Sequence, residues 1–130
     1  TDPVADLLTR IRNGAQEKHE RIEVPASRLK ANLVRVLKEE GFIKNFRLIR
    51  DDSGFVTIRV FLKYDENGDS VIHGIRKVSK PGVRRYTKIT KLPKVLGGIG
   101  TLILTTSKGL MTSQKATQGN VGGEILCEVW

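Results

Sequence analysis

A short polar loop in the last quarter of the chain holds the residues best suited to chemistry. The loop, Thr105–Gly109, combines three hydroxyl side chains, one cation and one glycine. Hydroxyl groups can hydrogen-bond to base edges or to a ribose hydroxyl, and Lys108 can neutralise a phosphate. Gly109 leaves room for another backbone to come close. The loop is therefore either a nucleic-acid contact, through Thr106, Ser107, Lys108 and Gly109, or an ordinary turn, and the residues alone support both interpretations.

A second loop of small residues, Asn120–Glu124, allows the same two interpretations. Gly122 and Gly123 would let a ligand approach the backbone, and Glu124 is the first acidic residue after a long basic stretch. Tyr86 lies among basic residues, where its ring could stack on a base or pack across a strand pair. Aromatic residues make up only 5% of the chain, so a platform of several exposed rings is not predicted.

The positive charge of the chain is concentrated in its second half. The net charge is +9, and residues 67–130 hold 10 basic and 3 acidic side chains. Between Asp69 and Glu124 there is no acidic residue, so we expect the cations there to lack carboxylate partners and to attract polyanions. A nucleic-acid partner is favoured over an unpartnered basic face, and over a membrane surface, because no helix pairs a basic with an aromatic face. The basic residues of this stretch include Arg76, Lys77, Lys80, Arg84, Arg85, Lys88, Lys91 and Lys94.

The sequence lacks the motifs of an enzyme or a metal site. His19, His73 and Cys127 have no metal-type spacing, and a single cysteine allows no internal disulfide. Gly98–Gly100 lacks the third glycine of a dinucleotide loop and precedes a strand instead of a helix. Ser27–Lys30 matches S-x-x-K but is better interpreted as a helix cap followed by a surface lysine. We therefore predict no catalytic residue, metal, cofactor or small-molecule substrate, and a reducing, cytoplasmic location.

The first half of the chain alternates helical and strand patterns. Asp2-Pro3 is typical of a helix start. Arg21–Val24 indicates a strand, and Ser27 can cap a second helix that ends near Gly41. Residues 42–50 and 55–62 indicate a hairpin around residues 51–54. The buried stripes of the two helices are predicted to be Val4, Leu7, Leu8 and Ile11, and then Leu29, Leu33, Val36 and Leu37.

The second half has mainly strand patterns. We expect strands at residues 71–78, 83–89, 101–106 and 124–130, a turn at residues 79–82, and a short helix within residues 110–117. The fold class is thus α+β with two small domains: an N-terminal α-β-α-β-β unit and a C-terminal, mostly β unit with a short helix. We place the first domain at residues 1–64, a linker at residues 65–70 and the basic, β-rich domain at residues 71–130.

Several segments, taken together and in order, resemble the eighth small-subunit ribosomal protein family in its bacterial form. The loop Thr105–Met111 is similar to the signature loop of that family, and the ending Gly122–Trp130 is similar to its C-terminus. The resemblance covers nearly the whole chain. The other matching segments are Asp2–Asn13, Val24–Arg28, Gly41–Lys44, and Val78–Gly82 followed by Arg85 and Tyr86.

The resemblance implies a primary binder of the central domain of small-subunit ribosomal RNA that acts early in assembly, among neighbouring ribosomal proteins. We expect it to be a monomer within the ribosome, because the sequence shows no coiled-coil pattern and no self-complementary patch. It implies that Thr106–Gly109 meet the minor groove and a displaced base of an irregular helix. Tyr86, Gly122, Gly123 and Glu124 would shape the same pocket, and Lys30 and Arg12 would be the contribution of the first domain. It also suggests the protein's own messenger RNA as a second partner.

Two other classes of function stay open at this point. One is a non-ribosomal, basic regulator that binds DNA or messenger RNA, although the basic half shows no helix-turn-helix pattern. The other is a basic protein-interaction module, which would bind its partner unchanged at high salt and have no affinity for RNA.

Overall fold

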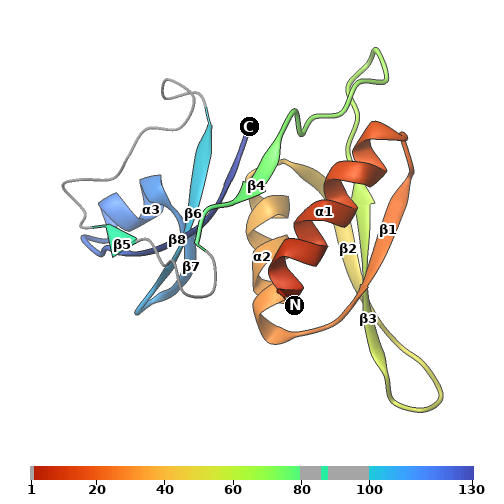
Figure 1. Cartoon of the computed structure of the whole chain (residues 1–130), viewed down its shortest axis with the longest axis horizontal. Helices are drawn as coiled ribbons and strands as arrows, with labels where there is room; N and C mark the ends of the chain where they lie inside the picture. Colours follow the sequence, from red (N-terminus) through yellow and green to blue (C-terminus); the bar gives the residue numbers. More distant parts are fainter. Residues whose placement is uncertain (1, 80–85, 88–99) are drawn as a thin grey trace. The chain divides into compact units, whose positions relative to one another are not determined.

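The computed structural model describes residues 2–79, 86–87 and 100–130, and the chain divides into two compact units, Thr1–His73 and Gly74–Trp130 (Figure 1). Residues 65–70, expected as a linker, form a turn of the first unit. The Asp65 Oδ1 atom accepts hydrogen bonds from the amides of Asn67 at 2.8 Å and of Asp69 at 3.0 Å. Backbone hydrogen bonds from the Asp65 amide to the Asp69 carbonyl at 2.8 Å and from the Gly68 amide to the Asp65 carbonyl at 3.0 Å complete this turn.

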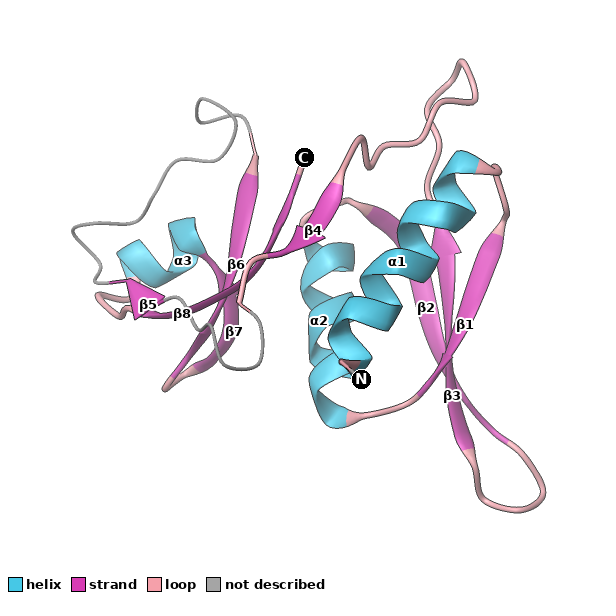
Figure 2. Cartoon of the chain, viewed as in Figure 1, coloured by secondary structure: helices cyan, strands magenta, loops and turns pink. Residues whose placement is uncertain are grey.

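The first unit is a three-stranded antiparallel sheet with two helices on one face (Figure 2). The strand order is β1-β3-β2, and the long β2–β3 hairpin is the one expected around residues 51–54. Both predicted helices are present. The elements in chain order are α1 (Pro3–Gln16), β1 (Arg21–Pro25), α2 (Arg28–Glu39), β2 (Ile43–Arg50) and β3 (Val56–Leu62).

The two helices begin where the sequence predicts, and three of the four residues predicted for the buried stripe of α2, Leu33, Val36 and Leu37, are buried. Asp2 accepts hydrogen bonds from the first amides of α1, and Ser27 accepts one from the Lys30 amide at 3.2 Å. The predicted stripe of α1 is fully buried. In α2, Leu29 is 39% exposed, and Lys30, expected at the surface, is only 5% exposed. The buried positions of α2 are Lys30, Leu33, Val34, Val36 and Leu37.

The second unit is an antiparallel sheet with one short helix. Its strand order is β4-β8-β6-β7, and β5 also pairs with β8. One side of the sheet packs on α3 through a cluster of Leu102, Leu104, Ala116 and Ile125, with Val78, Met111 and Val121 beside it. The elements are β4 (Ile75–Lys77), β5 (Tyr86–Thr87), β6 (Thr101–Thr106), β7 (Gly109–Thr112), α3 (Ser113–Gln118) and β8 (Gly123–Val129). This architecture confirms the predicted α+β fold class.

Four local predictions for the second unit need correction or lie partly outside the described residues. The helix expected within residues 110–117 is wrong in its first half: residues 110–112 continue β7, and the helix begins only at Ser113, capped by Thr112. The strand expected at residues 71–78 is limited to β4. Of the turn at 79–82 and the strand at 83–89, only Ser79, Tyr86 and Thr87 are described.

The end of α3 determines how the chain enters β8. Asn120 has a φ of 56°, in the left-handed region that asparagine tolerates better than most residues. The Val121 amide donates to the Ala116 carbonyl at 3.0 Å, and the Asn120 amide donates to that of Thr117 at 3.2 Å. These two bonds form a Schellman motif, which brings Val121 onto the core cluster. The short loop at residues 120–122 is thus held by the end of α3 on one side and by β8 on the other.

Cys127 is expected to make the second unit less stable at alkaline pH. Its side chain is completely buried in β8, and burial raises the pKa of the thiol to about 12. An exposed thiol ionises near pH 9, so between pH 9 and 12 the unfolded chain has lost a proton that the native protein keeps. The free energy of unfolding should then fall by about 1.4 kcal/mol per pH unit relative to a Cys127→Ala variant. Urea unfolding of both proteins at several pH values measures this difference, and parallel pH profiles would contradict it.

Candidate nucleic-acid interface

The predicted signature loop is the tight turn of the β6–β7 hairpin. Thr106 pairs with Gly109 in the register, so Ser107 and Lys108 form the tip, and both are exposed. The Thr106 hydroxyl accepts a hydrogen bond from the Lys108 amide at 3.1 Å and donates one to the Gly109 carbonyl at 2.8 Å. Gly109 has a φ of +105°, a conformation that glycine adopts without a steric penalty. Thr106 therefore organises the turn, and the tip offers one hydroxyl and one cation to a ligand.

We expect the Thr106 hydroxyl to be necessary for the shape of this turn. Thr106→Val keeps the side-chain size but removes both hydrogen bonds, whereas Thr106→Ser keeps them. Loss of the bonds should destabilise the second unit by about 1–2 kcal/mol. Urea unfolding checks this, with Thr106→Ser as the matched control. Equal stabilities of the two variants would show that the turn does not depend on the hydroxyl.

The strand register brings the two predicted loops together at one end of the sheet. Gly109, Thr106, Gly123 and Thr87 lie opposite one another across four adjacent strands. The next row consists of Leu110, Thr105, Glu124 and Tyr86. Because neighbouring strands lie about 4.8 Å apart, each row spans roughly 14 Å. Residues far apart in the sequence thus lie side by side at one end of the sheet.

Gly123 occupies a position at which only glycine fits. A Cβ atom built on this residue would lie 2.2 Å from the carbonyl oxygen of Thr105 in the neighbouring strand. Gly122 beside it is half-buried, and Glu124 is 9% exposed. This end of the sheet is therefore closely packed, with a carboxylate set into it and the exposed Ser107–Lys108 tip nearby.

The remaining predicted contact residues divide into two groups. Arg84, Arg85 and Lys88 lie outside the described residues. Arg12 and Lys30 belong to α1 and α2 of the first unit, where Arg12 is half-buried and Lys30 is buried. Thr87, whose backbone shares the row of Gly123 and Thr106, was not among the predicted contact residues. Its only signal was its place after Tyr86 in an expected strand.

At least one cation of the basic second half, expected to lack a carboxylate partner, does have one. Arg76, counted among cations without partners, forms an ion pair with Glu128. The two residues are 52 positions apart in sequence but are direct partners in the β4–β8 register. Sheet pairing thus neutralises one cation, a contact that could not be inferred from the local spacing of charges.

None of the helices in the part of the chain that the structure describes is long and apolar enough to cross a membrane. Among residues 2–79, 86–87 and 100–130, no three or more histidine, cysteine, aspartate or glutamate side chains form a group that could hold a metal ion.

Comparisons with known proteins match the whole chain. The family model described as ribosomal protein S8 matches residues 2–130. Small ribosomal subunit protein uS8 of Streptococcus sanguinis (strain SK36) is 55% identical over 130 residues, which cover 100% of this chain and 98% of the relative. The proteins of the same name from Streptococcus gordonii (strain Challis) and Streptococcus pneumoniae serotype 19F (strain G54) are 56% and 57% identical, with the same coverage. The chain therefore belongs to the ribosomal protein S8 family and is a structural protein of the small ribosomal subunit, not an enzyme.

Proposed function

We propose that the chain binds small-subunit ribosomal RNA through the end of the second sheet, at an irregular helix of the RNA's central domain. The observation that supports this most is the strand register, which places the β6–β7 turn, Gly123, Glu124 and the backbone of Tyr86 side by side. The proposed contact residues are Thr106, Ser107, Lys108, Gly109, Tyr86, Gly122, Gly123 and Glu124.

The geometry of RNA explains why such a site would suit it. The major groove of A-form RNA is too deep and narrow for side chains, so recognition uses the wide minor groove, ribose hydroxyls and unpaired bases. The exposed Ser107 hydroxyl can exchange hydrogen bonds with a ribose or a base edge, and Lys108 can meet a phosphate. Glu124 adds an acceptor for amino or hydroxyl groups of a displaced base.

The rest of the charge would add affinity without sequence discrimination. Arg84, Arg85 and Lys88 are proposed to contact phosphates, each releasing bound counterions and making affinity depend on salt. Arg12 and Lys30 are proposed as contacts from the first unit. Lys30 has little exposed surface, so its contribution would be limited to what its ammonium group reaches at the end of its buried stem.

The setting of this activity is the cytoplasmic ribosome of a bacterium, as for the relatives. We propose that the chain acts there as a monomer, binds early in subunit assembly and contacts neighbouring ribosomal proteins. A messenger RNA that imitated the ribosomal site would compete for the same residues, which would allow the protein to repress its own translation.

A salt-titrated competition tests the proposal. The labelled RNA helix from the central domain competes with a scrambled RNA hairpin and with a DNA copy of the helix. We expect the native RNA to be preferred over both, with a preference that persists as salt is raised. If all three compete equally and binding disappears as salt is raised, the binding comes only from nonspecific electrostatic attraction to the basic residues. The loop assignments are then wrong.

A further inference from the structure

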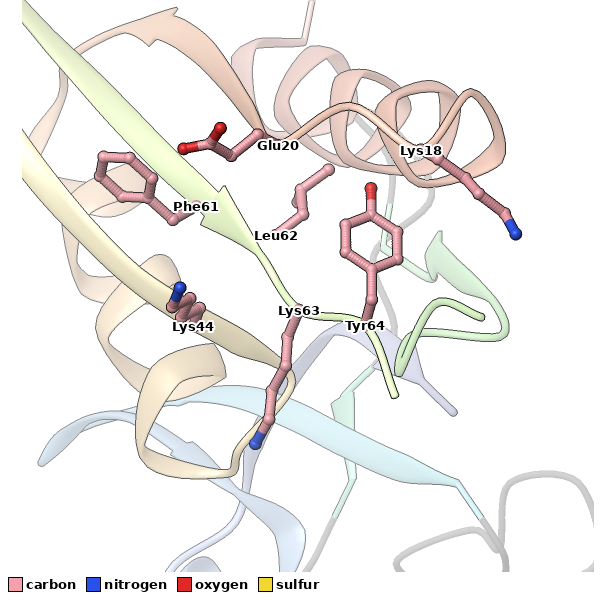
Figure 3. A pocket seen from close by; sticks show the side chains of 7 residues that line it. All are labelled: Lys18, Glu20, Lys44, Phe61, Leu62, Lys63 and Tyr64. Carbon is pink, nitrogen blue, oxygen red and sulfur yellow. The ribbon is translucent and has the colours of Figure 1, made fainter. Parts of the chain in front are cut away.

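A concave site lies in the first unit and shares no residue with the proposed contact site. It is a pocket of about 570 Å³ beside the end of β3, within the size range of pockets that hold small ligands (Figure 3). Side chains reach it from the segment after α1, from β2 and from β3 with the two residues beyond it. The lining residues are Lys18, Glu20, Lys44, Phe61, Leu62, Lys63 and Tyr64.

Backbone and side-chain hydrogen bonds hold the walls of this pocket in place. The Tyr64 hydroxyl donates to the His19 carbonyl at 2.5 Å, and the Leu62 amide donates to that of Glu20 at 2.9 Å. Phe61 lies on the face of β3 opposite the buried Leu62, with the Arg47 guanidinium 6.0 Å from its ring centroid. The Tyr64 ring is thus held by its hydroxyl, and the Phe61 ring has a cation beside it.

The charge of the pocket is positive. Three ammonium groups surround it against the single carboxylate of Glu20. Lys18 lies 3.9 Å from Asp69, but both side chains are more than half exposed, so this ion pair contributes little. Lys44 and Lys63 are exposed as well. An anionic ligand would therefore gain from at least two lysines.

We propose that this pocket binds an unpaired nucleotide of an RNA strand, with its base against Phe61 and Tyr64 and its flanking phosphates on Lys44 and Lys63. Aromatic rings beside a positive groove are the combination that binds single-stranded nucleic acid. An acidic peptide would satisfy the lysines but brings no flat ring for the two aromatic walls. The inference rests on the proposed role as an RNA binder and adds a contact on the other unit.

The test uses the full chain and a uridine hexanucleotide as the probe. We expect the hexanucleotide to shift the NMR signals of the Phe61 and Tyr64 rings. Lys44→Gln combined with Lys63→Gln should lower the slope of log affinity against log salt by about 1.4, since each phosphate contact on a single strand contributes about 0.7. Phe61→Leu, which keeps an apolar side chain, should weaken binding at least about fivefold through lost stacking.

A matched control removes the same charge elsewhere on the first unit. Arg28→Gln combined with Arg50→Gln changes two exposed cations that do not line the pocket, and it should leave the ring shifts in place. Equal effects of the two double variants, or no ring shifts with the hexanucleotide, would overturn the inference. So would ring shifts produced by hexaglutamate but not by the hexanucleotide, which would identify the pocket as a protein contact. If the ribosomal RNA helix still binds in that case, the proposed function stands and only this inference is wrong.

Discussion

Gly123→Ala is expected to destabilise the second unit by about 3 kcal/mol, the upper end of the usual cost of overpacking. The added Cβ would lie 2.2 Å from the Thr105 carbonyl oxygen and 3.0 Å from its carbon. These are backbone atoms of the neighbouring strand, so no side-chain rotation can relieve the contact. β6 and β8 must separate where Thr106 pairs with Gly123, and the two proposed RNA-binding loops separate with them. Urea unfolding, followed by the fluorescence of Trp130, measures the loss.

Alanine substitutions at two other glycines of the same unit distinguish a steric clash with a neighbouring strand from backbone strain as the cause of a stability loss. Gly119, the C-cap of α3, has a φ of −86°, and its added Cβ would lie 3.4 Å from the Lys115 carbonyl, so alanine should be almost neutral there. Gly109 has open space around a Cβ but a φ of +105°, so alanine should cost about 1–2 kcal/mol through backbone strain alone. If Gly123→Ala were as stable as Gly119→Ala, the close approach of the two strands would not be essential.

The chain's local patterns predicted most elements of the fold, and the errors have physical causes. The stripe of α1 follows helical spacing because all its members are apolar, and the structure confirms it. In α2, the predicted Leu33, Val36 and Leu37 are buried, and the error is confined to the exposed Leu29. Lys30 was assigned to the surface because of its charge, although its apolar stem allows the side chain to be buried. The start of α3 was placed too early because Leu110 and Met111 fit a helix and a strand equally well. Only pairing with β6 decides for the strand.

The candidate site, too, could be predicted only in part from the sequence, because it depends on contacts between residues that are far apart in the chain. The composition of each loop indicated which residues could meet RNA. Their juxtaposition depends on Gly123 lying beside Thr106 and on Glu124 lying between Thr105 and Tyr86, which is a matter of strand register. Register is set by the packing of whole strands, so the spacing of a few residues does not reveal it. The same reasoning applies to the Arg76–Glu128 pair, whose partners meet only in the sheet.

Ser107→Ala is expected to weaken binding of the native ribosomal RNA helix by about 1–3 kcal/mol, because a buried polar group of the RNA would lose its partner. Binding of a scrambled hairpin should not change, since phosphate contacts dominate there. Ser107 is exposed at the turn tip, and the Thr106 hydroxyl makes the internal bonds of the turn, so the variant should fold normally. The measurement is competition between the two RNAs at fixed salt, together with urea unfolding of the variant.

Arg85→Ala provides the contrasting variant for Ser107. If Arg85 contacts a phosphate, its loss should weaken the native and the scrambled RNA alike and should reduce the salt slope by about 1. Ser107→Ala should instead leave the salt slope unchanged, because a hydroxyl releases no counterion. In that case, the turn tip distinguishes the native RNA from the scrambled RNA, and the basic stretch contributes affinity that does not depend on the RNA sequence. Equal losses on both RNAs for Ser107→Ala would contradict this division and would leave the β6–β7 turn as a structural feature only.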